Sequence, residues 1–312
     1  MKELLFLKPI FKEMIWGGDH LRSVFGYDIP SEKTGECWAI SANPHGDCEI
    51  LSGSFKGMTL SELWSCHREL FGDVTGSVFP LLVKIIDAKE DLSIQVHPDD
   101  KYASKYENGS LGKTECWYVL DCNENSSIII GHNASSKKEM CEMIEKKEWS
   151  DLIREVPVRK GDFFQIEPGC IHAIKAGTMV LETQQNSDIT YRVYDYDRLQ
   201  NGVPRQLHIK KSIDVATVPF KQNDNDRIIE ITNDMTRETL VSCKYYNVER
   251  IKISHAAKIS HTYNFLNISV INGTGNINGT EIKKGTHFIA PFGYGDMNFE
   301  GSLEMIFSFV NN

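Results

Sequence analysis

The sequence lacks the features that would assign it to a membrane or secreted class. No run of ~18 uncharged apolar residues occurs, so we expect no transmembrane helix. Near the start, the apolar run covers only Leu4 to Leu7, which is too short for a signal-peptide core. The eight cysteines include no CxxC pair, which favours free thiols in a reducing compartment over a disulfide framework. Together these absences predict a cytoplasmic protein.

Positive charge is also scarce. The 312 residues carry 34 Lys and Arg against 43 Asp and Glu, giving a formal net charge of -9. This balance argues against nucleic acid or an anionic membrane as the main partner, but it still allows a local basic pocket for a phosphate. No Gly-rich dinucleotide loop leads from a strand into a helix. We therefore expect a small-molecule partner and a monomer or homodimer.

Short strand-like runs separated by Gly, Asn, Asp and Pro fill most of the chain, as is typical of a sandwich or barrel. Three stretches instead predict helices, each beginning at an N-cap residue: 59–71, 99–108 and 136–156. The last of these lies between strand-like runs. It predicts a helical insertion into a β scaffold.

A short internal sequence repeat, called the echo below, indicates two similar barrels. Lys160 to Gly169 reads KGDFFQIEPG, and Lys284 to Gly293 reads KGTHFIAPFG. Both resemble the second motif of cupins, which are small jelly-roll barrels. His172 follows the first copy, whereas Asp296 stands at the histidine position of the second. We expect a mainly β fold of two cupin-like jelly-roll barrels: a catalytic domain over 1–215 that carries the helical segments, and a metal-free domain over 216–312.

The stretch LSIQVHPDD, Leu92 to Asp100, alternates apolar and polar residues. As a strand it places Ser93, Gln95 and His97 on one face, and we expect its apolar face to pack against the other sheet. A surface strand would turn this polar face to water. Residues later in the chain indicate whether this polar face is exposed to solvent or lines a binding site.

The run KTECWYVL, Lys113 to Leu120, places Glu115 on a face with large apolar groups. A buried carboxylate needs a partner, a proton or a metal, and an ion pair with Lys113 is the simplest alternative. His172 begins a strand after a Pro-Gly turn. His97, Glu115 and His172 together form a set that suits catalytic zinc with an open position, and also iron(II). Gln95 is a possible fourth ligand, or a residue that does not bind the metal but hydrogen-bonds to one of its ligands.

Basic and hydroxyl side chains complete the candidate site. Lys84 is a charge inside the apolar run LLVKIID, and strict alternation places Arg192 on one strand face with Tyr194 and Tyr196. With Ser93 and Lys113 they supply the donors that a phosphate needs. The alternative for Arg192 is a surface residue stacked on aromatics and paired with a nearby Asp. We expect the other histidines to be surface or structural residues: His20, His45, His67, His132, His208, His255, His261 and His287.

The chain resembles type I mannose-6-phosphate isomerases of the short bacterial kind. The matching pieces lie in about the first 200 residues: PIFKEMIWGG, GECWAIS, PLLVKIIDAKEDLSIQVHPDD, GKTECWYVL, EPGCIHAI and NSDITYRVYDYDR. The resemblance implies one Zn2+ per chain, held by His97, Glu115 and His172, with Gln95 as a ligand in longer members. It implies Arg192 as the active-site arginine, and Ser93 and Lys113 as contacts to the substrate or its phosphate.

The implied reaction interconverts mannose 6-phosphate and fructose 6-phosphate through a zinc-stabilised enediol(ate). A general base is required, and the sequence leaves a zinc-bound water, Lys113 and Asp188 as candidates. Two other functions remain as alternatives: an iron(II) cupin oxygenase and a non-enzymatic sugar-binding bicupin.

Overall fold

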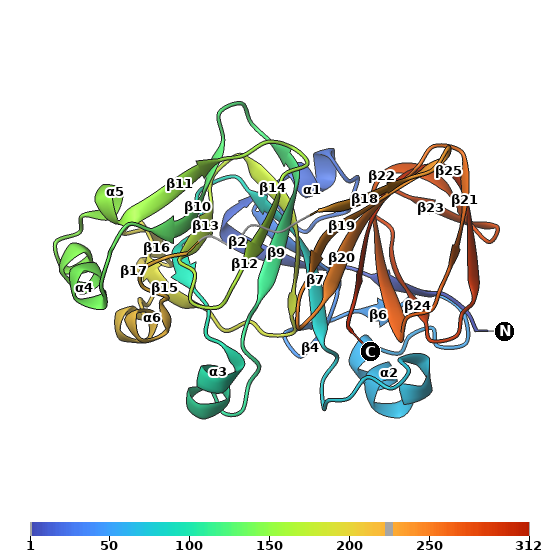
Figure 1. Cartoon of the computed structure of the whole chain (residues 1–312), viewed down its shortest axis with the longest axis horizontal. Coiled ribbons are helices and arrows are strands. Elements are labelled where there is room, and N and C mark those ends of the chain that lie inside the picture. The colour runs from blue at the N-terminus through green and yellow to red at the C-terminus, as the bar shows by residue number, and fades with distance from the viewer. Residues whose placement is uncertain (1, 222–226, 312) are drawn as a thin grey trace.

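Strands dominate the computed structural model, which describes residues 2–221 and 227–311. They form two β bodies that lie side by side (Figure 1). The prediction of a mainly β fold is therefore confirmed. Within the described residues, no helix has the length and apolar character needed to cross a membrane.

The first body is built from two sheets. The six-stranded sheet has the order β12 (Phe163–Ile166), β9 (Glu115–Cys122), β14 (Thr178–Gln185), β7 (Leu81–Ala88), β2 (Ile10–Gly18) and β3 (Thr34–Ile40). The five-stranded sheet has the order β11 (Ile153–Pro157), β10 (Ser127–His132), β13 (His172–Ile174), β8 (Ile94–Val96) and β15 (Tyr191–Tyr194). Apolar side chains of both sheets, among them Trp117, Ile130 and Val180, form one core.

The second body is formed by one long sheet. Its order is β18 (Ile228–Ile231), β19 (Met235–Ser242), β20 (Asn247–Ile253), β25 (Asp296–Phe309), β22 (Phe265–Ile277), β24 (His287–Pro291), β1 (Leu5–Lys8) and β6 (Glu49–Ile50). Strand β21 (Ala256–Ser260) pairs with β25, and β23 (Thr280–Lys283) with β22. A core of Ile, Leu, Val, Met and Phe side chains fills this body.

Strand β1 comes from the start of the chain but pairs with β24 of the second body. The division of the chain at 215/216 stays a prediction, and residues 222–226 of the expected boundary lie outside the described residues. The two copies of the echo adopt the same local shape. Gly161 and Gly285 have φ values of 90° and 87°, and each precedes a short strand that ends near a proline.

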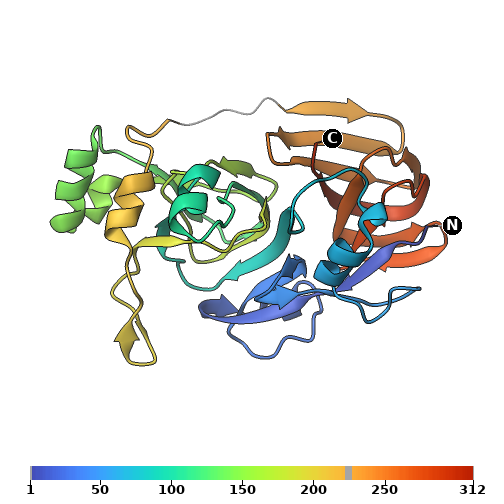
Figure 2. The ribbon, with the colours of Figure 1, turned by 90° about the horizontal axis from the view of Figure 1, so that it is seen from below.

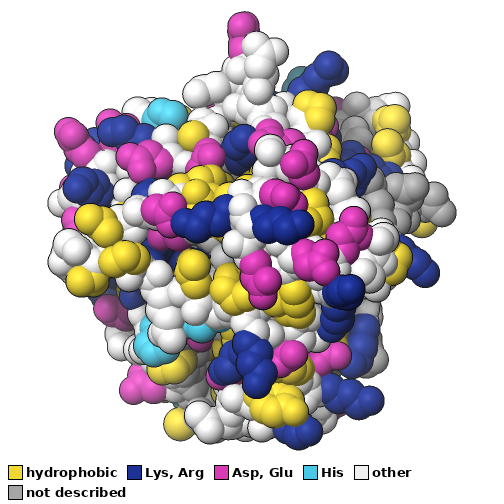
Figure 3. Space-filling view, turned by 90° about the vertical axis from the view of Figure 1, so that its left-hand side faces the viewer, with side chains coloured by type: hydrophobic (Ala, Val, Ile, Leu, Met, Phe, Trp, Pro, Cys, Tyr) yellow, Lys and Arg dark blue, Asp and Glu magenta, His cyan; other side chains and the backbone are white. Residues whose placement is uncertain are grey.

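Several helices gather at the end of the first body away from the second, as Figure 2 shows, whereas the helix over Leu60–Cys66 lies beside the second body (Figure 1). The helices of both bodies have the following bounds. They are α1 (His20–Ser23), α2 (Leu60–Cys66), α3 (Asp100–Tyr106), α4 (Lys137–Glu145), α5 (Trp149–Leu152) and α6 (Ile209–Val215). The 3-10 helix η1 (Arg68–Leu70) and two hairpins, β4 (Ala42–Asn43) with β5 (Gly46–Asp47) and β16 (Leu199–Gln200) with β17 (Val203–Pro204), complete the described elements. Acidic and basic side chains are interspersed on the helical end of the molecule (Figure 3).

Two of the three predicted helices are confirmed with their caps. Thr59 and Glu62 form a capping box on α2, and the Asp99 side chain accepts from Tyr102 N at the start of α3. The third prediction, one helix over 136–156, is wrong at its C-terminal end. Lys147 has a φ of 57° after α4, and the segment from Ile153 pairs with β10 as strand β11.

Candidate active site

His97, Glu115 and His172 lie together between the two sheets of the first body. His172 belongs to β13, pairs in register with Gln95 of β8, and lies near His97 just beyond that strand. Glu115 opens β9 of the facing sheet. The two histidine Nε2 atoms are 3.2 Å apart, and the Glu115 oxygens lie 3.4 Å from His97 Nε2 and 3.3 Å from His172 Nε2. Three atoms that could bind a metal ion therefore lie close together, and their role as ligands stays a prediction.

The outer nitrogen of each imidazole is fixed by a backbone carbonyl. His97 Nδ1 donates to Ile189 O at 2.8 Å, and His172 Nδ1 donates to Cys170 O at 2.9 Å, since a carbonyl can only accept. Both Nε2 atoms are then free of protons in the neutral ring and point at the shared centre. Burial, followed by the charge of Lys113, lowers the pKa of His97 to about 3, and burial lowers the pKa of His172. Neutral imidazoles are the form that binds a metal.

Glu115 is fully buried, and its Oε1 has no hydrogen-bond partner in the described residues. The nearest cation is Lys113 Nζ, 2.8 Å from Glu115 Oε2. The ion pair between Glu115 and Lys113, which was the alternative to a metal site, is thus present, and both histidines also lie beside Glu115. A buried carboxylate with unused acceptor positions beside two neutral imidazoles fits a metal ion. The Gln95 amide reaches the same place, 3.3 Å from His172 Nε2.

A cavity of about 360 Å³ opens in front of this cluster. Gln95 and Lys113 line it and separate it from the three converging residues. Ser93, Lys84 and Arg192 also line it, so the structure brings together all the side chains that the sequence selected. The polar face of LSIQVHPDD therefore points inward. We expected its apolar face to pack against the other sheet, and this expectation is wrong. Ile94 and Val96 instead pack against side chains of α4 and α6.

Arg192 lies in the cavity wall and is not paired with a neighbouring Asp. Its Nε donates to Ser93 Oγ at 3.3 Å, and its Nη1 donates to Gln206 O at 2.9 Å. The alternation predicted beyond it fails, because a register shift after Arg192 displaces Tyr194 from the Arg192 face. The Tyr194 ring instead stacks on Trp149, with the ring centroids 4.3 Å apart.

Lys84 has the predicted position but not a free charge. Its Nζ lies 3.5 Å from Glu182 Oε1 and 3.8 Å from Glu36 Oε2, and it faces the Trp38 ring. Two carboxylates therefore offset this ammonium, which makes it a weaker candidate for an anion than the sequence indicated. Lys113 is held in a similar way by Glu115.

Glu182 of β14 is a cavity residue that sequence reasoning missed. It is buried, its Oε2 accepts from Trp117 Nε1 at 3.0 Å, and its Oε1 has no hydrogen-bond partner among the described residues. Burial, and then the neighbouring Glu115 charge, raise the pKa of this carboxyl. The signal was present: Glu182 directly follows the apolar run MVL, as Glu115 directly precedes the apolar run CWYVL.

Arg205 is the second missed residue of the cavity wall. Its Nε and Nη2 bind both oxygens of Asp195, which also accepts from Arg198. Arg192, Arg198 and Arg205 thus place three guanidinium groups around one buried carboxylate. Arg192 and Arg205 line the cavity whereas Arg198 does not, so this part of the wall carries two guanidinium groups against the Asp195 carboxylate, in a protein whose net charge is negative. No sequence pattern linked Arg205 to the site, because it follows the hairpin β16–β17.

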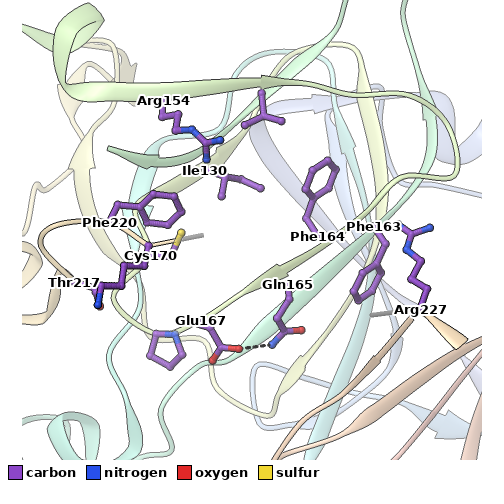
Figure 4. Close-up of a pocket in the computed structure, with 13 residues that line it drawn as sticks. Ile130, Arg154, Phe163, Phe164, Gln165, Glu167, Cys170, Thr217, Phe220 and Arg227 are labelled. Atoms are coloured by element: carbon purple, nitrogen blue, oxygen red, sulfur yellow. Dashed lines mark hydrogen bonds between the residues drawn. The ribbon is translucent and has the colours of Figure 1, made fainter. Parts of the chain in front are cut away.

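A second hollow, of about 450 Å³, lies along β12 and includes side chains from β10 and β11 (Figure 4). Phe163, Phe164 and Phe220 form much of its lining, and Gln165 donates to Glu167 at its edge. None of the residues predicted for the site lines it. The residues that the sequence predicted for substrate binding therefore line the smaller cavity.

Comparison with known proteins shows the family of this chain. Residues 4–130 match the model of the type I phosphomannose isomerase catalytic domain, and residues 236–310 match the mannose-6-phosphate isomerase cupin domain. Mannose-6-phosphate isomerase ManA of Bacillus subtilis is 50% identical over 311 residues, which cover 98% of each chain. The chain belongs to the type I mannose-6-phosphate isomerase family.

Two further proteins extend the comparison. Mannose-6-phosphate isomerase of Streptococcus mutans is 48% identical over 316 residues, covering 100% of this chain and 99% of that protein. The crystal structure of mannose 6-phosphate isomerase from B. subtilis superposes with a TM-score of 0.98 at 49% identity, over 99% of this chain and 100% of that one. The predicted cupin-type fold is confirmed by the cupin-domain match and this superposition.

Proposed function

We propose that this chain interconverts mannose 6-phosphate and fructose 6-phosphate with one bound Zn2+. The observation that carries the proposal is the convergence of His97, Glu115 and His172 behind a cavity with a cationic wall. Such a reaction moves a proton between C2 and C1 of the sugar, one of which is the carbonyl carbon, and it needs no redox cofactor. It does need a way to stabilise charge on oxygen, a base, and a binding place for the phosphate.

The three converging residues would hold the metal. Two neutral nitrogens and one carboxylate are a common set for catalytic zinc, which leaves a position open. Gln95 is close enough to serve as a further ligand or to orient His172. When bound, the ion would supply Lewis-acid stabilisation of negative charge on the substrate carbonyl oxygen, a contribution of several kcal/mol.

The phosphate belongs at the wall formed by Ser93, Arg192 and Arg205. A dianionic phosphate offsets the excess positive charge there, and the planar guanidinium group offers paired donors to its oxygens. The Ser93 hydroxyl lies within reach of Arg192, so both can address one phosphate. Lys84 has a secondary role, because Glu36 and Glu182 already face it. Lys113 is an ammonium beside Glu115 and can donate to a substrate oxygen.

Glu182 is our choice for the general base. It lines the cavity, and its Oε1 has no hydrogen-bond partner that would compete for a proton. Trp117 fixes the other oxygen, so the carboxylate has one defined orientation. Asp188, proposed from the sequence, also lines the cavity but is 41% exposed in its side chain and is held by His45. A buried base is better protected from water during proton transfer.

A coupled isomerase assay with mannose 6-phosphate tests the proposal directly. We expect activity in the zinc-loaded protein, loss on treatment with a chelator, and recovery when Zn2+ is returned. Glucose 6-phosphate should fail as a substrate, because it differs from mannose 6-phosphate in the configuration at C2. Unchanged turnover in protein shown by elemental analysis to be metal-free would refute the metal-dependent mechanism.

A further inference from the structure

Arg192 lies on an edge strand, which leaves one side of its backbone without a strand partner. Within the residues that the structure describes, strand β15 is the last strand of the five-stranded sheet and pairs only with β8. The register shift that follows Arg192 weakens the ladder further at this point. Sheet pairing alone therefore holds the arginine poorly, although it lines the cavity.

His208 supplies the missing partner. Arg192 N donates to His208 Nδ1 at 3.2 Å, and His208 N donates to Arg192 O at 2.8 Å. The pair of bonds resembles one rung of a β ladder, with an imidazole nitrogen in place of a carbonyl. Gln206, two residues earlier, accepts from Arg192 Nη1, so the same short segment holds both the backbone and the guanidinium.

His208 is itself firmly placed, because it is the N-cap residue of α6. Its carbonyl accepts from Ser212 N at 2.8 Å and from Ser212 Oγ at 2.9 Å. Its side chain makes no capping bond to the helix, so the imidazole is committed to Arg192. Burial, then the charges of Arg192 and Lys211, lower the pKa of His208, which keeps the accepting nitrogen unprotonated.

The position needs such support, because like charges crowd it. Burial and then the charge of Arg205 lower the pKa of Arg192, and Arg198 adds to this repulsion. Asp195, the carboxylate among these arginines, is bound to Arg198 and Arg205. We call the contacts that His208 and Gln206 make to Arg192 the clamp. Without the clamp, the Arg192 guanidinium would be free to turn towards water.

We infer that His208 is a positioning residue, which fixes Arg192 for the phosphate-bearing substrate through the Arg192 backbone. This inference rests on the function proposed above. Misplacement of a positioning group by about 1 Å can cost on the order of a hundredfold in rate, so the clamp has a measurable consequence. No residue of the clamp contacts the proposed metal ligands through its side chain, which separates its effect from metal binding.

The test compares His208→Ala with His208→Asn. Asn places a side-chain oxygen near the position of Nδ1 and is a good N-cap residue, so it restores the acceptor. For His208→Ala we expect kcat/KM to fall roughly tenfold to a hundredfold with unchanged zinc content, and for His208→Asn a value within about threefold of wild type. His255→Ala, at an exposed histidine of the second body, is the matched control and should change nothing.

A double-mutant cycle identifies the route of the effect. If His208 acts through Arg192, then His208→Ala should cost almost nothing further in an Arg192→Met background. The same loss in both backgrounds, or equal losses in the Ala and Asn variants, would overturn the inference.

Amide hydrogen exchange over residues 191–194 gives a readout that does not depend on activity. Exchange should be faster in His208→Ala than in wild type or His208→Asn. This measurement tests the clamp even if the wild-type protein shows no isomerase activity, a result that would refute the proposed function alone. Unchanged exchange in His208→Ala would refute the clamp itself.

Discussion

Replacing Lys113 by Met should make the protein bind Zn2+ more tightly. Lys113 Nζ lies 2.8 Å from Glu115 Oε2 and 3.3 Å from His97 Nε2, so its positive charge lies beside the atoms that would hold the ion. In the metal-free protein this ammonium compensates the buried Glu115, and breaking such a pair costs roughly 3–5 kcal/mol. In the loaded protein the ion itself compensates Glu115. The loss therefore falls mainly on the metal-free state.

The expected gain in affinity follows from that difference. About 3 kcal/mol, the lower end of the range, corresponds to roughly a hundredfold tighter binding. Competition against a chromogenic chelator of known zinc affinity measures it. Lys84→Met is the matched control, because Lys84 is equally buried but pairs with Glu182 and Glu36; we expect a change within about threefold. Unchanged or weaker binding by the Lys113→Met protein would refute the electrostatic argument.

Three further predictions use other parts of the structure. His172→Ala should lose both zinc and activity, whereas Arg192→Ala should keep zinc and lose turnover; metal analysis beside the isomerase assay separates them, and metal loss in Arg192→Ala would contradict its assigned role. Glu182→Gln should lower kcat by roughly 10²–10⁴-fold with zinc retained, as expected for a general base, and near-normal kcat would transfer that role to another group. Burial lowers the pKa of His287 to about 3. Below about pH 6.5, the usual pKa of histidine, the unfolded chain therefore binds a proton here that the native state does not bind. His287 should lower the free energy of unfolding by about 2 kcal/mol between about pH 7.5 and about pH 5, and denaturant titrations should show a shallower fall for His287→Gln.

The residues that sequence reasoning found are polar groups whose place relative to apolar residues is visible in a short stretch of sequence. Lys84 interrupts an apolar run, Glu115 shares its strand face with large apolar groups, and Gln95 and His97 alternate with apolar residues. Because strand geometry fixes which side chains share a face, these placements followed from local pattern alone. The capping residues of α2 and α3 were predictable for the same reason.

What was missed depends on contacts between distant segments. Arg205 enters the cavity wall because Asp195 binds it across a hairpin, and His208 reaches Arg192 because α6 packs on β15. A β-bulge after Arg192 moved Tyr194 away from the face that strict alternation assigned to it. The helix predicted over 136–156 failed where Ile153 and its neighbours gained a strand partner in β10, a tertiary contact that overrides local helix preference.

The second body shows why one half of an echoed sequence can carry the chemistry while the other supports it. Its interior is packed with apolar side chains, and Asp296, at the position of the missing histidine, is exposed and pairs with Lys258. One large core joins the outer face of the six-stranded sheet, including Cys116 and Leu181, to residues of the second body such as Phe265. That face belongs to the strands whose opposite faces carry Glu115 and Glu182. The second body thus backs the sheet that positions both carboxylates, and substitutions in this shared core should reach the site by tilting β9 and β14.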